Sequence, residues 1–194
     1  MPLKHKLAKL IFESSLLKRI ERTGYSYLGT GKENVASHSY GVVFITYLLC
    51  KFFSKEVNEL KALKMALIHD FTEARIGDFN AVNKLYNQAD EKRALKDAFS
   101  ELPFYEEVLI LFEEYRKNES LEAKIVHDAD VLDLIVQLKE QKDLNNPFAE
   151  RWINYAKRRL ILKESKELAE AILEIEWCAW WLERLLKEKD EKEP

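Results

Sequence analysis

Residues 66–78 of this chain read ALIHDFTEARIGD, and this stretch is its most informative one. Its apolar first residues lead directly into an adjacent histidine and aspartate, His69 and Asp70, and two further carboxylates follow at Glu73 and Asp78. An apolar segment does not normally carry a histidine and three carboxylates unless these groups are paired, exposed or bound to a ligand. Imidazole nitrogen and carboxylate oxygen are ligands for divalent metals such as Mn, Fe, Co and Zn. The stretch therefore indicates a metal site.

The rest of the composition favours an all-α protein. The chain has 194 residues, of which 47% are hydrophobic, and it contains only Gly 5 and Pro 4. This is enough apolar material for the core of a single domain, and few glycines or prolines interrupt helices. A net charge of −3 gives no global basic field for nucleic acid. Because no run of about 18 apolar residues and no secretory leader is found, we expect a cytoplasmic protein without a membrane partner.

Apolar periodicity and breaker residues predict eight helices. The run from Val42 to Leu49 has strand-like residues, but the lack of turn signals on either side favours a buried helix. Ser120 is the predicted N-cap of the sixth helix. A loop with three glycines is expected after residue 22. Seven of the predicted helices span residues 3–20, 59–70, 90–101, 105–117, 120–142, 148–160 and 165–188. The other, second in the chain, starts between Asn34 and Ser37 and runs to about Ser54.

Two further positions can complete a metal site with His69 and Asp70. His38 lies near the start of the second predicted helix, and Asp130 lies in the sixth. Together the four side chains supply two nitrogens and two oxygens, and they leave coordination positions open for water and substrate, as a catalytic metal requires. Spacing alone does not decide between this site and ordinary structural roles, because a single histidine is more often a hydrogen-bonded core residue than a ligand.

The histidine–aspartate dipeptide occurs a second time, at His127-Asp128, so the two copies must be distinguished. Only His69-Asp70 has acidic residues following closely at Glu73 and Asp78. The second copy is expected to be incidental, and its segment contributes Asp130. Asp128 and Asp133 are the alternative ligands if Asp130 points away from the site.

Four motifs in order carry a family resemblance: Arg22-Thr23-Gly24-Tyr25, residues 33–39, residues 69–78, and residues 114–130. In these motifs the chain resembles the HD-domain metal-dependent phosphohydrolases, and within them the 5′-deoxynucleotidase branch. The resemblance covers about residues 15–142 and implies an all-α HD-domain helical bundle with a metal site between helices. We expect one HD domain over residues 1–194, with residues 147–188 forming additional C-terminal helices.

The resemblance also implies roles for individual residues. The metal ligands match His38, His69, Asp70 and Asp130, which would hold one divalent ion per chain, whether Mn, Co, Fe, Ni, Zn or Mg. Glu73 matches the acidic residue beside the catalytic water, and Arg22 matches the phosphate-binding arginine. Asp78 matches an acidic residue that faces the nucleotide, reads the sugar hydroxyls and favours deoxyribose. Tyr25 falls where relatives commonly carry Trp, and it is a weaker candidate for contact with substrate.

These residue types suit the hydrolysis of a phosphomonoester, which needs an activated water, neutralised charge at phosphorus and a positioned acid or base. Glu73 lies three residues after Asp70, where it can orient or deprotonate water; either Glu73 or Asp78 can protonate the leaving 5′-oxygen. We expect hydrolysis of deoxynucleoside 5′-monophosphates. The alternatives are an HD phosphohydrolase acting on a cyclic nucleotide, an alarmone or a phosphonate, and a non-catalytic helical interaction protein that keeps its metal for stability.

Two C-terminal features carry further expectations. Trp177, Trp180 and Trp181 fall at helical spacing, which favours core packing or a homodimer interface over stacking on a nucleobase. A homodimer also agrees with the habit of the resembled family. Residues 157–159, Lys-Arg-Arg, form a short basic run that is more typical of a solvated face than of a nucleic-acid site.

Overall fold

The computed structural model describes residues 1–53 and 57–190, and within these ranges every regular element is a helix. The one β contact described is an isolated bridge between Glu21 and Asn34. The predicted all-α class is therefore confirmed. The helices are α1 (Leu3–Leu16), η1 (Leu17–Arg19), α2 (Tyr25–Leu28), α3 (Val35–Phe52), α4 (Glu59–Ile68), α5 (Glu73–Ile76), α6 (Asn83–Tyr86), α7 (Glu91–Phe99), α8 (Tyr105–Lys117), α9 (Leu121–Asp143), α10 (Ala149–Lys157), α11 (Lys163–Glu174) and α12 (Ala179–Asp190).

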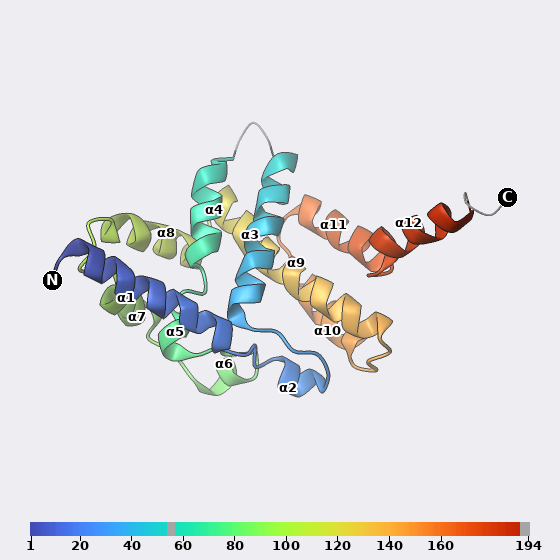
Figure 1. The fold of residues 1–194 in the computed structure, drawn as a ribbon, viewed down its shortest axis with the longest axis horizontal. Coiled ribbons are helices and arrows are strands. Elements are labelled where there is room, and N and C mark those ends of the chain that lie inside the picture. The colour runs from blue at the N-terminus through green and yellow to red at the C-terminus, as the bar shows by residue number, and fades with distance from the viewer. Residues whose placement is uncertain (54–56, 191–194) are drawn as a thin grey trace.

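Helices α3 and α9 pack against each other through the middle of the molecule, with α4, α10 and α11 around them (Figure 1). Helix α9 is buried on several faces, so its sequence shows no single apolar stripe. Removing apolar side chains from water at this contact is the main stabilising contribution to the fold. The fully buried apolar residues of α3 and α9 include Val42, Leu49, Ile125 and Leu132.

The strand-like run in α3 is helical, as its lack of turn signals predicts. By length and composition α3 could also cross a membrane, since its mean hydropathy is 1.2. Its apolar residues Val42 and Leu49 are buried against neighbouring helices, and it carries the fully buried His38. We therefore interpret α3 as a core helix of the bundle.

Ser120 caps α9 as predicted, because its Oγ accepts a hydrogen bond of 3.2 Å from the N–H of Ala123. The cap sets where α9 begins, and therefore the register of every later position in the helix. Asp130 and Asp133 lie one turn apart, and both face α3. The same register places Asp128 on another side, toward α11.

The predicted helix over residues 165–188 is wrong. The chain leaves helical geometry at Ile175, whose φ of −98° and ψ of 137° are extended, and α12 begins only at Ala179. The backbone N–H of Trp177 in this break donates instead to Asp143 Oδ2 at 3.1 Å. Because of the break, α12 extends away from the remaining helices (Figure 1).

Smaller differences concern the ends of elements. The first helix ends at Leu16 and continues only as the 3₁₀ turn η1, and the third ends at Ile68 rather than at residue 70. The glycine loop contains a short helix, α2, that closes at Gly29 with a positive φ of 83°. The predicted end of the second helix at Ser54 lies outside the described residues.

Candidate active site

Three helices bring the four predicted metal ligands together. His38 lies in the first turn of α3, His69 and Asp70 directly follow α4, and Asp130 lies in α9. His38, His69 and Asp130 each offer a ligand atom within 4.8 Å of the other two. Asp70 Oδ2 lies 3.5 Å from His38 Nε2 and 3.2 Å from His69 Nε2. Ligand atoms about 2.0–2.2 Å from a shared ion would have such separations.

The two histidines present the same nitrogen to this cluster. The Nδ1–H of His38 donates to Asp133 Oδ2 at 2.7 Å, and the Nδ1–H of His69 donates to the carbonyl oxygen of Ala66 at 2.7 Å. A metal-ligating histidine is typically held in this way, because the second hydrogen bond fixes the tautomer and leaves the other nitrogen free to coordinate. Both Nε2 atoms are buried and have no hydrogen-bond partner among the described residues. The donor set therefore fits a divalent metal.

The charged groups of the cluster strongly shift one another's pKa values. Burial and Arg22 act to lower the pKa of His38, but neighbouring Asp130 and Asp133 outweigh them and raise it to about 10. Burial acts to raise the pKa of Asp70, but His69, His38 and Arg22 hold it well below its usual range. This surplus of negative charge around the histidines favours a cation, and a divalent metal would take the place of the proton that the carboxylates hold on His38.

Gly41 makes room for the carboxylate that holds His38. A Cβ at this position in α3 would lie 1.9 Å from Asp133 Oδ1, which is closer than any real contact. A glycine inside a helix costs about 1 kcal/mol relative to alanine, so the local sequence preference is overridden here by close packing of α3 on Asp133.

Glu73 is the acidic side chain of the site that lacks a partner. It begins the short helix α5, and its Oε2 is buried without a hydrogen bond among the described residues. Burial raises the pKa of Glu73 to about 9, and Asp70 and Asp78 add to the increase. A carboxyl group with such a pKa can hold a proton near neutral pH and release it to a basic atom.

Arg22 lies between Asp70 of the cluster and Asp78. Arg22 Nη1 is 3.4 Å from Asp70 Oδ2 and 3.8 Å from Asp78 Oδ1. Asp78 Oδ2 accepts two hydrogen bonds of 2.6 Å, from the N–H and the Oγ1 of Thr23. The Gly77-Asp78 pair therefore fixes the loop that carries Arg22. These bonds occupy Asp78 Oδ2, whereas Glu73 Oε2 has no hydrogen-bond partner in the part of the chain that the structure describes.

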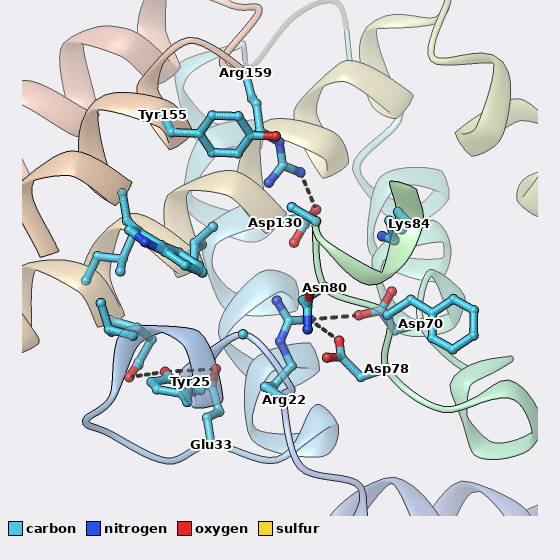
Figure 2. Close-up of a pocket in the computed structure, with 18 of the residues that line it drawn as sticks. Arg22, Tyr25, Glu33, Asp70, Asp78, Asn80, Lys84, Asp130, Tyr155 and Arg159 are labelled. Atoms are coloured by element: carbon cyan, nitrogen blue, oxygen red, sulfur yellow. Dashed lines mark hydrogen bonds and ion pairs between the residues drawn. The ribbon is translucent and has the colours of Figure 1, made fainter. Parts of the chain in front are cut away.

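These groups line one cavity of about 900 Å³, which includes open solvent at its mouth (Figure 2). Tyr25 lines the cavity, and its hydroxyl lies 3.2 Å from Gln137 Oε1 and 3.4 Å from Glu33 Oε2. The indole of Trp152 lies over Gly24, since a Cβ there would be 3.8 Å from its ring. The cavity thus has a charged end and an aromatic wall.

The second histidine–aspartate pair has a structural position. Asp128 is fully buried and accepts backbone hydrogen bonds from Ile161 and Leu162, just before α11 begins. Asp133 contacts the Nδ1 side of His38, away from the cluster. Neither residue replaces Asp130, whose Oδ1 lies 3.2 Å from His38 Nε2.

The structure brings together all the predicted site residues: His38, His69, Asp70 and Asp130 form the cluster, and Glu73, Asp78, Arg22 and Tyr25 line the cavity beside it. The roles of Asp133, Thr23 and Gly41, and the cavity wall formed by α10, were not predicted from the sequence. A glycine inside a predicted helix is a signal of close packing that could have identified Gly41.

Comparisons with known proteins identify the family of this chain. Residues 14–175 match the HD-domain family. The 5′-deoxynucleotidase HDDC2 of Bos taurus is 32% identical over 136 residues, covering 67% of this chain and 65% of that protein. The 5′-deoxynucleotidase hdd1 of Schizosaccharomyces pombe is 31% identical over 167 residues, covering 72% of this chain and 83% of that protein. The chain thus spans just under two thirds of the length of HDDC2.

Solved structures show the same fold. A conserved hypothetical protein from Pyrococcus furiosus is 35% identical with a TM-score of 0.74, over 87% of this chain and 99% of that one. A predicted metal-dependent phosphohydrolase from Magnetospirillum magnetotacticum has a TM-score of 0.70 at 23% identity, over 89% and 91% of the two chains; that likeness shows the fold alone. The family match extends over most of the sequence and spans every residue of the cluster, and the chain therefore belongs to the HD-domain family.

Proposed function

We propose that this chain hydrolyses deoxynucleoside 5′-monophosphates to deoxynucleosides and phosphate, and that the reaction depends on a divalent metal. The observation that carries the proposal is a cavity lined by Asp70 and Asp130 of the histidine–aspartate cluster, by Arg22, and by Glu73, whose Oε2 has no hydrogen-bond partner among the described residues. The relatives named 5′-deoxynucleotidases, at about one third identity, support this substrate class.

His38, His69, Asp70 and Asp130 would hold the metal. When bound, it supplies a Lewis acid that activates water and neutralises charge on the phosphate. Asp133 and the carbonyl of Ala66 orient the two imidazoles toward it, so the ligand geometry is set before the metal arrives.

Arg22 binds the phosphate. Its planar guanidinium can donate to two phosphate oxygens at once, which a lysine cannot do. The carboxylates of Asp70 and Asp78 hold it in position, and Thr23 links its loop to Asp78. Binding orients the phosphorus toward the attacking water and the 5′-oxygen toward the acid.

Glu73 transfers the protons. Its carboxyl, which burial keeps protonated near neutral pH, gives its proton to the leaving 5′-oxygen, so that an alcohol leaves rather than an alkoxide, and the resulting carboxylate takes up the proton of the attacking water. The unpaired Oε2 and the pKa of about 9 for Glu73 favour it over Asp78, whose oxygen already accepts two hydrogen bonds. Asp78 remains the candidate for recognising the sugar.

Phosphate release from a panel of substrates tests the proposal. We would assay deoxynucleoside 5′-monophosphates, the matching ribonucleotides, cyclic nucleotides and an alarmone, with Mg²⁺, Mn²⁺ and Co²⁺ added separately. The proposal expects release from the deoxynucleotides in the presence of at least one metal. Turnover of only cyclic nucleotides or alarmones favours another HD phosphohydrolase, and no release from any substrate favours a non-catalytic interaction protein.

We also propose that the chain forms a homodimer. Helix α12 exposes large apolar side chains, including Trp180 at 81% and Leu186 at 55% exposure, and exposed apolar groups of this kind mark interaction sites. Sedimentation equilibrium of the wild type and of a Trp180→Glu variant tests this proposal. A wild type that remains a monomer at micromolar concentrations would contradict it.

A further inference from the structure

A second arginine reaches the site from outside the four sequence motifs. Arg159 lies in the turn after α10, and its Nη2 is 3.5 Å from Asp130 Oδ2. It lines the same cavity as Arg22. Figure 2 shows the two guanidinium groups approaching the acidic residues from opposite sides. The basic run of residues 157–159 is therefore not simply a solvated face, since its last member points into the site.

The contact with Asp130 leaves most of the Arg159 guanidinium available. Charge-assisted N–H···O hydrogen bonds are typically about 2.7–2.9 Å long, so a single approach of 3.5 Å is weak. The Arg159 side chain is 37% exposed, and it makes no other side-chain hydrogen bond or ion pair within the described part of the chain. Its remaining donors are free to bind a ligand with several acceptor oxygens.

The charge of the site calls for such a group. Five carboxyl groups line the cavity: Glu33, Asp70, Glu73, Asp78 and Asp130. Arg22 is already shared between Asp70 and Asp78, so it offers only part of its charge to a phosphate dianion. An anionic ligand needs positive charge to bind against this acidic surface; Lys84 also lines the cavity and a bound divalent metal would contribute, and Arg159 supplies further positive charge at Asp130.

We propose that Arg159 is a second phosphate-binding residue, which contacts the substrate 5′-phosphate from the side opposite Arg22. The proposal deepens the proposed function and rests on it, because it assigns the phosphate end of the substrate to the space between the two arginines. It also gives the C-terminal helices a part in the site, since the turn after α10 supplies the contact.

Binding of inorganic phosphate and of deoxyadenosine to the manganese-loaded protein tests the proposal by calorimetry. Arg159→Ala should weaken phosphate binding about 10–100-fold, because a charge-assisted hydrogen bond contributes about 1.5–3 kcal/mol and each 1.4 kcal/mol is tenfold. Deoxyadenosine affinity and metal content should stay unchanged. Arg158→Ala is the matched control, because Arg158 is the exposed neighbour and should leave all three quantities at the wild-type value.

Kinetics separate this proposal from the proposed function. If the chain turns over deoxyadenosine 5′-monophosphate, Arg159→Ala should raise KM by a similar factor, and Arg159→Lys should recover part of the loss. If no deoxynucleotide is hydrolysed, the proposed function fails, while phosphate binding still tests Arg159. Unchanged phosphate affinity in Arg159→Ala overturns the proposal. Loss of metal in that variant also overturns it, since Arg159 would then only position Asp130.

Discussion

Replacing Gly41 by alanine should damage the metal site without touching any of its ligands. The new Cβ would lie 1.9 Å from Asp133 Oδ1 and 2.8 Å from its Cγ, so the Asp133 side chain must move away. That movement breaks the 2.7 Å hydrogen bond which orients His38. We expect metal affinity to fall about 10–100-fold, the usual effect of losing the partner of a metal-ligating histidine.

The effect on stability follows from two opposing contributions. Losing a buried hydrogen bond to a charged group costs about 1.5–3 kcal/mol, and overpacking adds to this cost. Alanine inside a helix returns about 1 kcal/mol relative to glycine. The free energy of unfolding of the metal-free protein should therefore fall by roughly 0.5–2 kcal/mol or somewhat more.

A double-mutant cycle with Asp133→Ala provides the assay. Metal affinity would be measured by titration and stability by urea unfolding, for both single variants and the double variant. In the Asp133→Ala background there is no carboxylate to displace, so Gly41→Ala should be neutral or stabilising by up to about 1 kcal/mol. Equal effects of Gly41→Ala in both backgrounds, or wild-type metal affinity in the single variant, would show that the new Cβ does not displace Asp133.

Three further predictions concern other carboxylates. Glu73→Ala should keep one metal per chain by elemental analysis while turnover falls about 10²–10⁴-fold, the usual contribution of a general acid or base; full activity with full metal would exclude this role. Asp128→Ala should lower the free energy of unfolding by about 2 kcal/mol through its lost bonds to Ile161 and Leu162, with metal content unchanged; a loss of metal would show that the second dipeptide belongs to the site. Burial acts to raise the pKa of Glu122, but the N–H of Asn58 and the ammonium of Lys61 help to lower it. Its stabilisation of about 1 kcal/mol should be present at neutral pH and be lost as pH falls through the lowered pKa, so that the wild type and Glu122→Gln become equally stable in acid; a gap that persists there would contradict the assignment.

Local signals explain why the sequence predicted much of the fold. The helix predicted at residues 105–117 is observed with the same bounds, and Ser120 caps α9 as predicted. Both predictions depend on residues that are close together in the sequence, since a cap and an apolar period involve neighbours only a few positions apart. The break after Glu174 was missed because its cause is distant in sequence. The N–H of Trp177 is bound by Asp143, a residue of another helix.

In the candidate active site, too, local sequence signals could be used for prediction and contacts between distant segments could not. The predicted ligands have residue types that suit a metal site, but spacing alone left structural roles open, and the family resemblance was needed to single out His69-Asp70. Arg159 carried no such signal, since a basic run is usually solvated and only the packing of α10 on α9 brings it to Asp130. The role of Asp133 likewise depends on how closely α3 approaches α9 at Gly41.

The most direct test of the account is the initial rate of phosphate release from deoxyadenosine 5′-monophosphate before metal removal by a chelator, after it, and after Mn²⁺ is restored. If the reaction depends on the metal, the chelator should lower the rate by roughly two orders of magnitude or more, because the metal supplies several kcal/mol of charge stabilisation. Restored Mn²⁺ should recover the rate in the wild type but not in His69→Ala. A rate that the chelator leaves unchanged, or no release under any of these conditions, would contradict the account.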